Sequence, residues 1–463
     1  MFDSHIYIER RKKLKNKFNT GLLFFAGNNE SPLNYAGNTY KFRQDSNFLY
    51  YFGIDIPGLA ALIDIDSNTT ILFGNDFTIN DIVWMGPQPS MSELAQASGM
   101  DRSEKYDNLY NVVPEAIRRK RNIHFLPQYR SEHFLLVGNL LGINPERVND
   151  YVSIDFIKAV IEQRSVKAEE EIGEIDKAVD IAYRMHTAAM KMIKPGLTER
   201  KIAGMIEGIA VSLGAGISFQ PIVSINGQTL HNPHYNNEIL YDSILVNDSG
   251  AETELHYASD ITRTIPAGGK FTNKQKEIYE VVLNAQMKCI ESVKPDVANK
   301  TLHLLAAKTI VEGLTNIGLM NGDPEEAVSE GAHALFFPHG LGHMLGLDVH
   351  DMEDLGEDLV GYDENNSRSD QFGLGYLRLA KSLKPGYTFT IEPGIYFIPS
   401  LIDQWKAENK FFDFINYDKV EQYSDFGGIR IEDNILVTEN GYRILGGKPI
   451  PKTVDEVETL ASK

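Results

Sequence analysis

Two acidic residues, Asp248 and Asp260, lie in strand-like apolar stretches on either side of a short turn. If the two stretches form a hairpin, both carboxylates lie on neighbouring strands and face one side. Carboxylates that close together in apolar surroundings repel each other unless a cation or a shared proton stabilises them. Taken alone, the pattern leaves open that both acids are solvated at the ends of a surface hairpin.

Two glutamates extend this acidic pattern. Glu392 follows Ile391 and Glu432 follows Ile431, each inside a stretch predicted to be a strand. Two divalent ions would balance the negative charges of these four carboxylates. Oxygen-rich ligation with one imidazole suits manganese, cobalt, iron or zinc. The acids therefore predict a site for two divalent metal ions, with a histidine as the remaining ligand.

The stretch HGLGHMLGLDVHD, from His339 to Asp351, holds three of the chain's 12 histidines. His339 and His343 are four residues apart, a spacing that places two zinc ligands on one face of a helix. However, the glycines between them disfavour a helix, and no glutamate follows His339. We therefore predict a loop. The glycine spacing does not match a phosphate-binding loop, and no serine nucleophile elbow occurs in the chain.

The elements that must position these residues fall into two parts. Up to about residue 165, apolar runs typical of strands, such as Leu22–Ala26 and Phe48–Phe52, alternate with helical patterns, which indicates an α/β domain with a partly parallel sheet. From residue 166 a long amphipathic helix begins, and a second helix ends at Leu213. Further strands are predicted at 239–246, 388–397 and 428–437, helices at 274–294 and 300–318, and a surface loop at 351–371. The second part is therefore predicted to be an α+β domain.

Composition and charge narrow the functional class. The formal net charge of −19 argues against a nucleic-acid partner, because binding phosphates needs a basic face. No run of 18 apolar residues occurs, and the N-terminus lacks the apolar core of a signal peptide, so we expect no membrane segment. The single cysteine, Cys289, excludes an internal disulfide and a cysteine metal cage. Together these features predict a cytoplasmic protein.

Over nearly its whole length the chain resembles the pita-bread metallopeptidases aminopeptidase P, prolidase and methionine aminopeptidase. A segment at 42–53 looks like the N-terminal domain that precedes the catalytic domain in the first two of these groups. The resemblance therefore implies an aminopeptidase P N-terminal-type α/β domain at 1–165 and a pita-bread catalytic domain at 166–463. It rests on motifs at 226–231, 260–264, 339–351, 391–394 and 430–433, which follow the family's order.

The resemblance also implies the roles of individual residues. His350 would face the substrate carbonyl, His231 would help bind the substrate or its leaving amine, and Glu392 would move a proton toward the leaving nitrogen. His339 would line the proline pocket, and Arg378 and Arg430 would bind substrate. The implied metal ligands are Asp248, Asp260, His343, Glu392 and Glu432, with Asp260 and Glu432 shared by both ions.

One departure from the family concerns the interval between Asp248 and Asp260, which is one residue longer than usual. We expect the extra residue in the turn around 252–254, where it leaves both acids in register; a bulge within a strand would misdirect one of them. The family's usual metal is manganese, with cobalt or zinc as alternatives. Members commonly form homodimers or tetramers.

The implied reaction is metal-assisted hydrolysis of the peptide bond between an N-terminal residue and a following proline. Aminopeptidase P acts on peptides of varied length, whereas prolidase accepts only Xaa-Pro dipeptides. Arg378 lies fourteen residues before Glu392 and could bind a dipeptide's carboxylate, as in prolidase, or could be a solvated surface residue. The segment 398–426 also resembles prolidase. We favour aminopeptidase P, with prolidase as the alternative. A non-catalytic pita-bread binding module is the remote alternative. Loss of metal ligands would mark such a module, and all five implied ligands are present.

Overall fold

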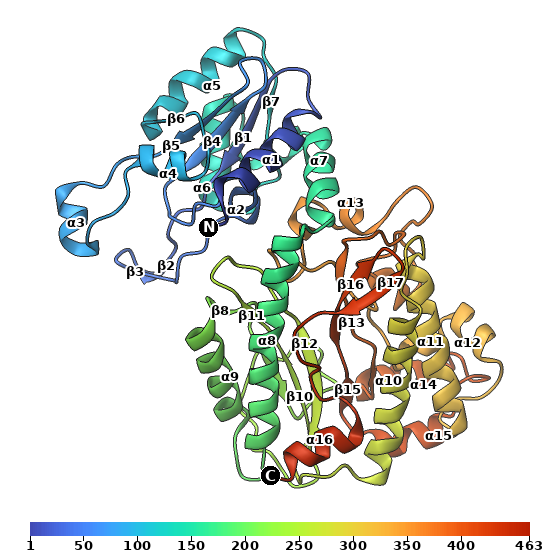
Figure 1. Ribbon diagram of the computed structural model, residues 1–463. Coiled ribbons are helices and arrows are strands. Elements are labelled where there is room, and N and C mark those ends of the chain that lie inside the picture. Colours follow the sequence, from blue (N-terminus) through green and yellow to red (C-terminus); the bar gives the residue numbers. More distant parts are fainter. The chain divides into compact units, whose positions relative to one another are not determined.

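The computed structural model describes residues 1–463 and divides into two compact units, Met1–Arg164 and Ser165–Lys463. Unit one is built on a five-stranded sheet in the order β6-β5-β4-β1-β7 (Figure 1). The β1–β4 and β4–β5 pairs are antiparallel, whereas β1–β7 and β5–β6 are parallel, so the sheet is partly parallel as predicted. The strands are β1 (Leu22–Ala26), β4 (Ala60–Asp64), β5 (Thr69–Phe73), β6 (Arg102–Glu104) and β7 (Ile123–His124).

Helices cover both faces of this sheet. Side chains of α5 (Leu109–Arg118) and α6 (Ser131–Leu141) pack on one face. On the other face, Phe25 contacts the ring of Phe156 at a centroid distance of 5.2 Å. The run Phe48–Phe52 is not a strand but part of α2 (Ser46–Phe52), because Asp45 caps its start and Gly53, with φ 67°, ends it. The other helices of this unit are α1 (Ser4–Lys15), α4 (Met91–Ala97) and α7 (Ile154–Ser165).

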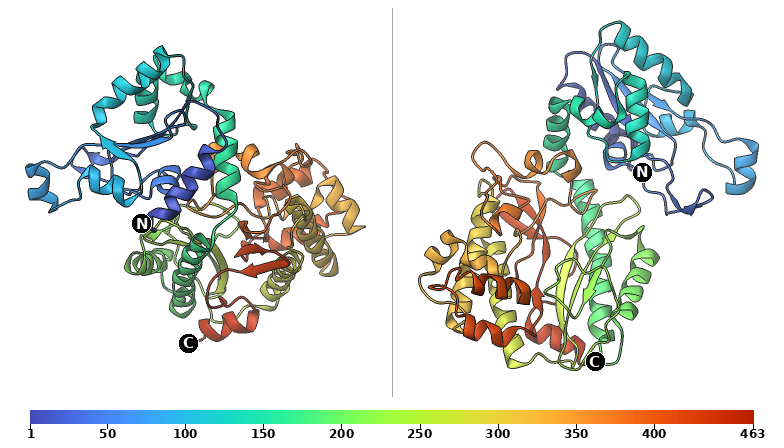
Figure 2. Two further views of the ribbon diagram at one scale, coloured as in Figure 1. Left: turned by 45° about the horizontal axis from the view of Figure 1, so that its top comes forward. Right: turned by 180° about the vertical axis from the view of Figure 1, so that it is seen from behind.

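Two small elements project from unit one (Figures 1 and 2). They are the hairpin of β2 (Pro32–Tyr35) and β3 (Asn38–Thr39), and the helix α3 (Ile79–Met85). No residue of α3 is buried, and Trp84 is 81% exposed. Apolar side chains on such projections are unusual for an isolated protein surface.

Unit two repeats one arrangement in two halves, each a pair of helices followed by strands, with the helices outside and the strands inside (Figure 1). The helix pairs are joined by similar turns, Lys194-Pro195-Gly196 and Lys294-Pro295-Asp296, in which Gly196 (φ 84°) and Asp296 (φ 68°) are both left-handed. The first half holds α8 (Glu169–Met192), α9 (Glu199–Leu213), β9 (Ile222–Ser224), β10 (Ile244–Ser249) and β12 (Ile261–Pro266). The second holds α10 (Asn273–Glu291), α11 (Asn299–Asn316), β13 (Thr388–Ile391), β14 (Gly394–Tyr396), β15 (Gly428–Arg430), β16 (Asp433–Thr438) and β17 (Gly441–Ile444).

Smaller elements complete unit two. They are β8 (Gly216–Ile217), β11 (Ala251–Glu252), α12 (Pro324–Glu330), α13 (Glu357–Gly361), α14 (Pro399–Ala407), α15 (Tyr417–Val420) and α16 (Val454–Ala461). In neither unit does any helix combine the length and the apolar character needed to cross a membrane.

The predicted strands of unit two differ from the observed ones at functionally important places. The strand predicted at 239–246 begins only at Ile244, because Leu240 to Ser243 form a turn in which the Leu240 N–H donates to Ser243 Oγ (3.3 Å). The strands predicted at 388–397 and 428–437 are each interrupted, one at Glu392 and the other at Glu432. At the first break, Pro393 has no N–H for a strand ladder.

Both glutamates therefore lie between strand segments rather than inside strands. At the breaks their backbone N–H groups leave the sheet pattern: that of Glu392 donates to the Leu341 carbonyl (2.8 Å) and that of Glu432 to the Thr262 carbonyl (3.1 Å). These bonds fix the direction of the two side chains independently of the alternation of a strand.

The surface loop predicted at 351–371 is also wrong in part. It contains a 3-10 turn (Glu353–Leu355) and the helix α13, and its first residue is buried. The Asp351 carboxylate pairs with Lys167 Nζ at 2.8 Å, and both side chains are only 1% exposed. This buried ion pair anchors the end of the HGLGHMLGLDVHD loop to the beginning of unit two.

Candidate active site

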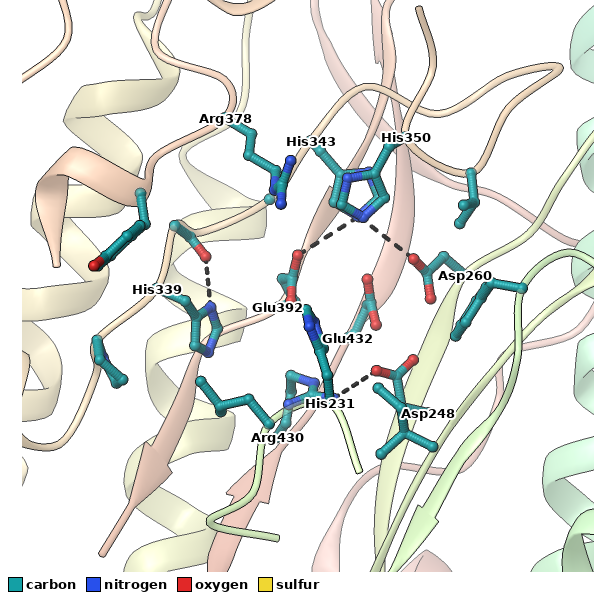
Figure 3. A pocket seen from close by; sticks show the side chains of 18 of the residues that line it. His231, Asp248, Asp260, His339, His343, His350, Arg378, Glu392, Arg430 and Glu432 are labelled. Carbon is teal, nitrogen blue, oxygen red and sulfur yellow. Dashed lines mark hydrogen bonds and ion pairs between the residues drawn. The ribbon is translucent and has the colours of Figure 1, made fainter. Parts of the chain in front are cut away.

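A cavity of about 910 Å³ in unit two brings together every site residue predicted from the sequence (Figure 3). The residues come from six separate segments of the chain, and most of them lie near the ends of strands. The ten residues are His231, Asp248, Asp260, His339, His343, His350, Arg378, Glu392, Arg430 and Glu432.

The hairpin of β10 and β12 places the first two acids. Asp248 is paired with Thr262, and Asp260 lies two residues before Thr262, so the two acids share one face. The register runs without a shift from Ile244 to Ser249. The longer interval is therefore absorbed outside the paired strands, in the connection that contains β11 and the turn after it. The left-handed conformation of His256 (φ 65°) closes this turn.

Asp260, His343 and Glu432 form the most compact metal-binding group, with ligand atoms within 4.8 Å of one another. The Nε2 atom of His343 lies 3.4 Å from Asp260 Oδ2 and 3.6 Å from Glu392 Oε1 (Figure 3). The other ring nitrogen, Nδ1, lies 3.1 Å from the Met344 carbonyl, which can only accept. A proton on Nδ1 leaves the lone pair of Nε2 directed at the carboxylates, as in a metal-binding histidine.

The acids of this cavity lie in surroundings that favour a bound cation. Burial raises the pKa of Glu392 to about 7, and repulsion by Asp260 adds to this effect. Burial, followed by the charges of neighbouring acids, raises the pKa of Asp260 and of Glu432 well above the usual range. Arg430 lowers the pKa of Asp260 and of Glu392, but this effect does not outweigh the lost solvation, so each group favours its neutral form.

Unpaired oxygen atoms provide the test of whether these residues fit metal ions. One buried carboxylate oxygen of each of Asp248, Asp260 and Glu432 has no hydrogen-bond partner. A buried polar atom without a partner costs free energy, and direct ligation by a hard divalent cation would recover it. The donor set of carboxylates and one imidazole nitrogen therefore fits divalent metal ions.

Arg430 neutralises part of this negative charge. Its Nη2 donates to Asp248 Oδ2 at 2.5 Å, and its Nη1 donates to the Tyr396 hydroxyl at 2.9 Å. The same hydroxyl lies 2.9 Å from His339 Nε2. Burial, and then Arg430, lowers the pKa of His339 to about 3, so this ring is a neutral acceptor. The four acids thus face one cation of the chain, which leaves a negative excess for metal ions.

The histidine loop lies directly against β13, and this contact explains its glycines. A Cβ atom on Gly342 would lie 2.0 Å from the Thr390 carbonyl oxygen, so no larger residue fits. His343 N–H donates to Thr390 Oγ1 (3.1 Å), which sets the ligand's position. His350 stacks on His343 with ring centroids 3.7 Å apart and an interplanar angle of 17°. The predicted loop conformation is confirmed.

Several residues of the site were not predicted. Thr262 Oγ1 donates to Glu432 Oε2 at 2.7 Å, and its position two residues after Asp260 on the same face could have revealed it. Tyr396 links His339 to Arg430. Glu353 lies 3.1 Å from His350 Nδ1 but belongs to the acidic stretch expected to be solvated. The contacts of Tyr396 join distant segments, so nothing in the local sequence indicates them, whereas Glu353 lies only three residues after His350 and its short spacing was the available signal.

The fold and the cavity define a protein whose carboxyl-rich, histidine-containing centre is built for divalent metal ions. The sequence profile described as metallopeptidase family M24 matches residues 173–439, and the profile described as aminopeptidase P, N-terminal domain, matches residues 7–124. The chain belongs to metallopeptidase family M24.

Similar proteins share nearly the whole chain. A probable Xaa-Pro aminopeptidase of Aspergillus clavatus is 34% identical over 91% of this chain and 88% of its own length. The human Xaa-Pro dipeptidase is 31% identical over 90% of this chain and 84% of its own length. Among solved structures, Pseudomonas aeruginosa aminopeptidase PepP matches with a TM-score of 0.83 and 25% identity, covering 100% of this chain and 98% of that one.

A zinc-substituted Escherichia coli aminopeptidase P in complex with product matches with a TM-score of 0.81 and 27% identity, again covering 100% of this chain and 98% of that one. The predicted fold class, an α/β N-terminal domain followed by an α+β pita-bread domain, is confirmed by these matches.

Proposed function

We propose that this metallopeptidase is a Xaa-Pro aminopeptidase, which hydrolyses the bond between an N-terminal residue and a following proline. The observation that carries the proposal is the convergence of all ten predicted site residues on one cavity. The Xaa-Pro aminopeptidase and aminopeptidase P relatives support the same reaction. We further propose that 1–165 and 166–463 act as the N-terminal and catalytic domains, in keeping with the division of the chain after Arg164.

Two divalent ions are proposed as cofactors, manganese natively, with cobalt or zinc as substitutes. The residues that would hold the ions are Asp248, Asp260, His343, Glu392 and Glu432. Unpaired oxygen atoms on three of these residues support this set. Bound there, the ions would supply an acidified water molecule and polarise the scissile carbonyl.

The chain's own residues then orient the peptide and move its proton. His350, whose Nδ1 is bonded to Glu353, would face the scissile carbonyl and stabilise the negative charge that develops on its oxygen. Glu392 would take a proton and return it to the proline nitrogen. His231, on the cavity wall, would bind the N-terminal part of the substrate or its leaving amine, and Arg430, besides holding Asp248, would lie along the substrate.

A dedicated proline pocket has a chemical reason. The bond before proline is a tertiary amide, and the ring restricts the preceding residue, so general peptidases fit it poorly. His339, whose Nε2 is hydrogen-bonded to the buried Tyr396 hydroxyl, lines the proposed pocket, and its neutral state leaves this part of the wall without charge. The negative excess beside Asp248 would attract the cationic N-terminus of the peptide.

The decisive experiment compares substrates on metal-depleted and manganese-loaded protein. Hydrolysis of a Xaa-Pro-Xaa tripeptide, absent after chelation and restored by manganese, is expected, with no cleavage of a matched Xaa-Ala-Xaa peptide. Turnover of a Xaa-Pro dipeptide alone would instead identify a prolidase. Inactivity toward both, with manganese, cobalt and zinc each tested, would contradict the proposal and leave a binding module.

The cellular setting follows from features outside the cavity. We propose a cytoplasmic protein with proline-containing peptides as partners and without nucleic-acid or membrane partners, supported by the net charge of −19 and the single buried Cys289. We also propose a homo-oligomer, dimer or tetramer, supported by the exposed apolar side chains of α3. Sedimentation of a Trp84→Ser variant is expected to show smaller particles, whereas Tyr151→Ser, equally on the surface of unit one, serves as the control.

A further inference from the structure

Glu353 occupies a place in the cavity that the proposed mechanism does not use. One carboxylate oxygen, Oε1, lies 3.1 Å from His350 Nδ1. The other, Oε2, accepts from Arg378 Nη1 at 2.5 Å. The side chain is only 19% exposed, so these two contacts are shielded from water more than a surface ion pair would be. Glu353 therefore connects the histidine at the reaction centre to an arginine on the cavity wall.

Arg378 matters because few cations line the cavity. The lining contains three basic side chains, Arg368, Arg378 and Arg430. Arg430 is 4% exposed and is bound to Asp248 and Tyr396. A free carboxylate of a bound peptide could therefore be neutralised only by Arg368 or Arg378.

Neither of these two arginines is available without competition. Arg378 is bound by Glu353 and also lies 3.4 Å from Glu357 Oε2. Arg368 binds Glu357 and Asp358 at 2.5 Å and 2.8 Å. The acid groups on this wall thus outnumber the arginines they face. A dipeptide's carboxylate would have to displace one of these acids and would be repelled by the others.

We infer that Glu353 is a specificity-determining residue that selects longer peptides over Xaa-Pro dipeptides, an inference that rests on the proposed function. In a dipeptide, the proline carries a free carboxylate. Glu353 repels this carboxylate, and it already pairs with the Arg378 guanidinium that could otherwise bind it. In a tripeptide or longer chain, a neutral amide takes the place of that carboxylate. Its N–H can donate to an acid on this wall. Arg378 therefore pairs with Glu353 of the protein and does not bind the substrate.

The Glu353→Gln substitution tests the inference, because glutamine still accepts a hydrogen bond from His350 Nδ1 while it no longer neutralises Arg378. With the manganese-loaded enzyme, kcat/KM for a Xaa-Pro dipeptide is expected to rise by about tenfold, mainly through a lower KM. The Xaa-Pro-Xaa tripeptide and the dipeptide amide, which lacks the carboxylate, share the altered His350 contact and are expected to change alike, so the ratio of dipeptide to tripeptide cleavage and the ratio of dipeptide to amide cleavage are the readouts. A purely structural role of Glu353 would change all three substrates alike.

Two further variants make the result unambiguous. Glu364→Gln removes the same charge from the same segment, at an exposed position outside the cavity, and is expected to leave the dipeptide-to-tripeptide ratio unchanged. Adding Arg378→Met to Glu353→Gln is expected to remove the gain, because the newly freed guanidinium is then absent.

An unchanged ratio in a folded Glu353→Gln enzyme that still cleaves the tripeptide would overturn the inference alone. Absence of tripeptide cleavage by the unaltered enzyme would instead refute the proposed function. If Glu353→Gln does not fold, as judged by circular dichroism, Glu353→Asp replaces it. The shorter side chain weakens the grip on Arg378, so a smaller rise in dipeptide cleavage is expected, and none would contradict the inference.

Discussion

Glu432 and Asp433 are neighbours in the chain, are 1% and 4% exposed, and lie in opposite electrostatic surroundings. Burial and the nearby acids raise the pKa of Glu432 well above its usual range. Burial alone would do the same to Asp433, but Arg263 and Lys452 outweigh it and lower the pKa of Asp433 to about 2. Arg263 Nη2 donates to Asp433 Oδ1 at 2.6 Å and Lys452 Nζ to Oδ2 at 2.7 Å.

The difference separates two uses of a buried carboxylate. Asp433 is neutralised by cations of the chain itself, so its charge belongs to the fold. Glu432 faces other acids and keeps one oxygen, Oε1, without a partner, so its charge is left for a cation from solution. Arg263 serves both residues, because its Nη1 also donates to the Glu432 carbonyl (2.6 Å) and thereby fixes the backbone between them.

The largest expected effect comes from removing the charge of Glu432. Glu432→Gln is expected to lower kcat/KM for a Xaa-Pro-Xaa tripeptide by at least about 10³-fold, because a proposed metal ligand is lost. Its unfolding free energy without metal is expected to be no lower than that of the unaltered protein, since one of several repelling acids is removed. Steady-state kinetics and urea unfolding measure the two quantities. Full turnover in this variant would contradict the assignment of Glu432 as a metal ligand.

Removing the charge of Asp433 should act on the fold instead. Asp433→Asn leaves the fully buried Arg263 without its anion, and the expected loss of unfolding free energy is about 3 kcal/mol. The same urea titration on metal-free protein provides the value. If this variant were as stable as Glu432→Gln, the distinction between the two carboxylates would not hold.

Metal binding should sharpen the contrast. Manganese at about 100 times its dissociation constant is expected to stabilise the chelated protein by about 2.7 kcal/mol, because it binds only the folded state. Asp433→Asn should keep this increment even though it starts from a lower stability. Glu432→Gln should lose most of it. Thermal unfolding with and without manganese measures the increment. The control for reversibility is that the chelated protein recovers its folded state without added calcium.

The smallest expected effect is on the pH dependence of stability and comes from His186 of α8. This histidine contacts the two chain neighbours of a third buried carboxylate, Asp248. Its Nε2 donates to the Ser249 carbonyl at 3.1 Å, and its Nδ1 accepts from Asn247 Nδ2 at 3.1 Å, so it holds both neighbours of Asp248. Burial, and then Arg263, lowers its pKa from 6.5 to about 4. The unfolded chain therefore binds a proton below 6.5 while the folded protein does not, and stability falls as the pH falls from 6.5 toward 4.

Glutamine at this position titrates at neither pH. The advantage in unfolding free energy of the unaltered protein over His186→Gln is expected to shrink by about 1 to 2 kcal/mol between about pH 7.5 and about pH 5. Urea unfolding of both proteins at several pH values measures this difference, in which the titration of the other acids cancels. A constant difference would show that His186 does not remain neutral in the folded protein.

The order of the helices could be predicted because short-range patterns encode it, and the cavity residues as a set could be predicted only through the resemblance to a known family. Apolar spacing marks α8 and α10, and Gly342 marks a place where the loop touches β13. Pro393 is a local signal of the break at Glu392, because it has no N–H for a strand ladder. The break at Glu432 has no such signal, and its backbone N–H leaves the strand pattern only through pairing with the distant Thr262 carbonyl.

Glu353 shows a different limit of the sequence. It lies in a stretch rich in acids, asparagine and glycine, whose composition is typical of a solvated loop. One partner, His350, is only three residues away, but the other, Arg378, is 25 residues away, so the ion pair that holds Glu353 in the cavity depends on how the chain returns there. The Lys167–Asp351 pair, which joins residues 184 positions apart, could not be seen in the sequence for the same reason.

The two-half arrangement of unit two has a consequence for when the protein becomes competent. The first half carries Asp248 and Asp260, whereas the second carries His343, Glu392 and Glu432. Neither half alone offers more than part of the proposed ligand set. Binding of an ion by all five proposed ligands therefore requires both halves to be folded and in contact, so metal uptake would report that the last strand, made long after the first on the ribosome, has reached its place.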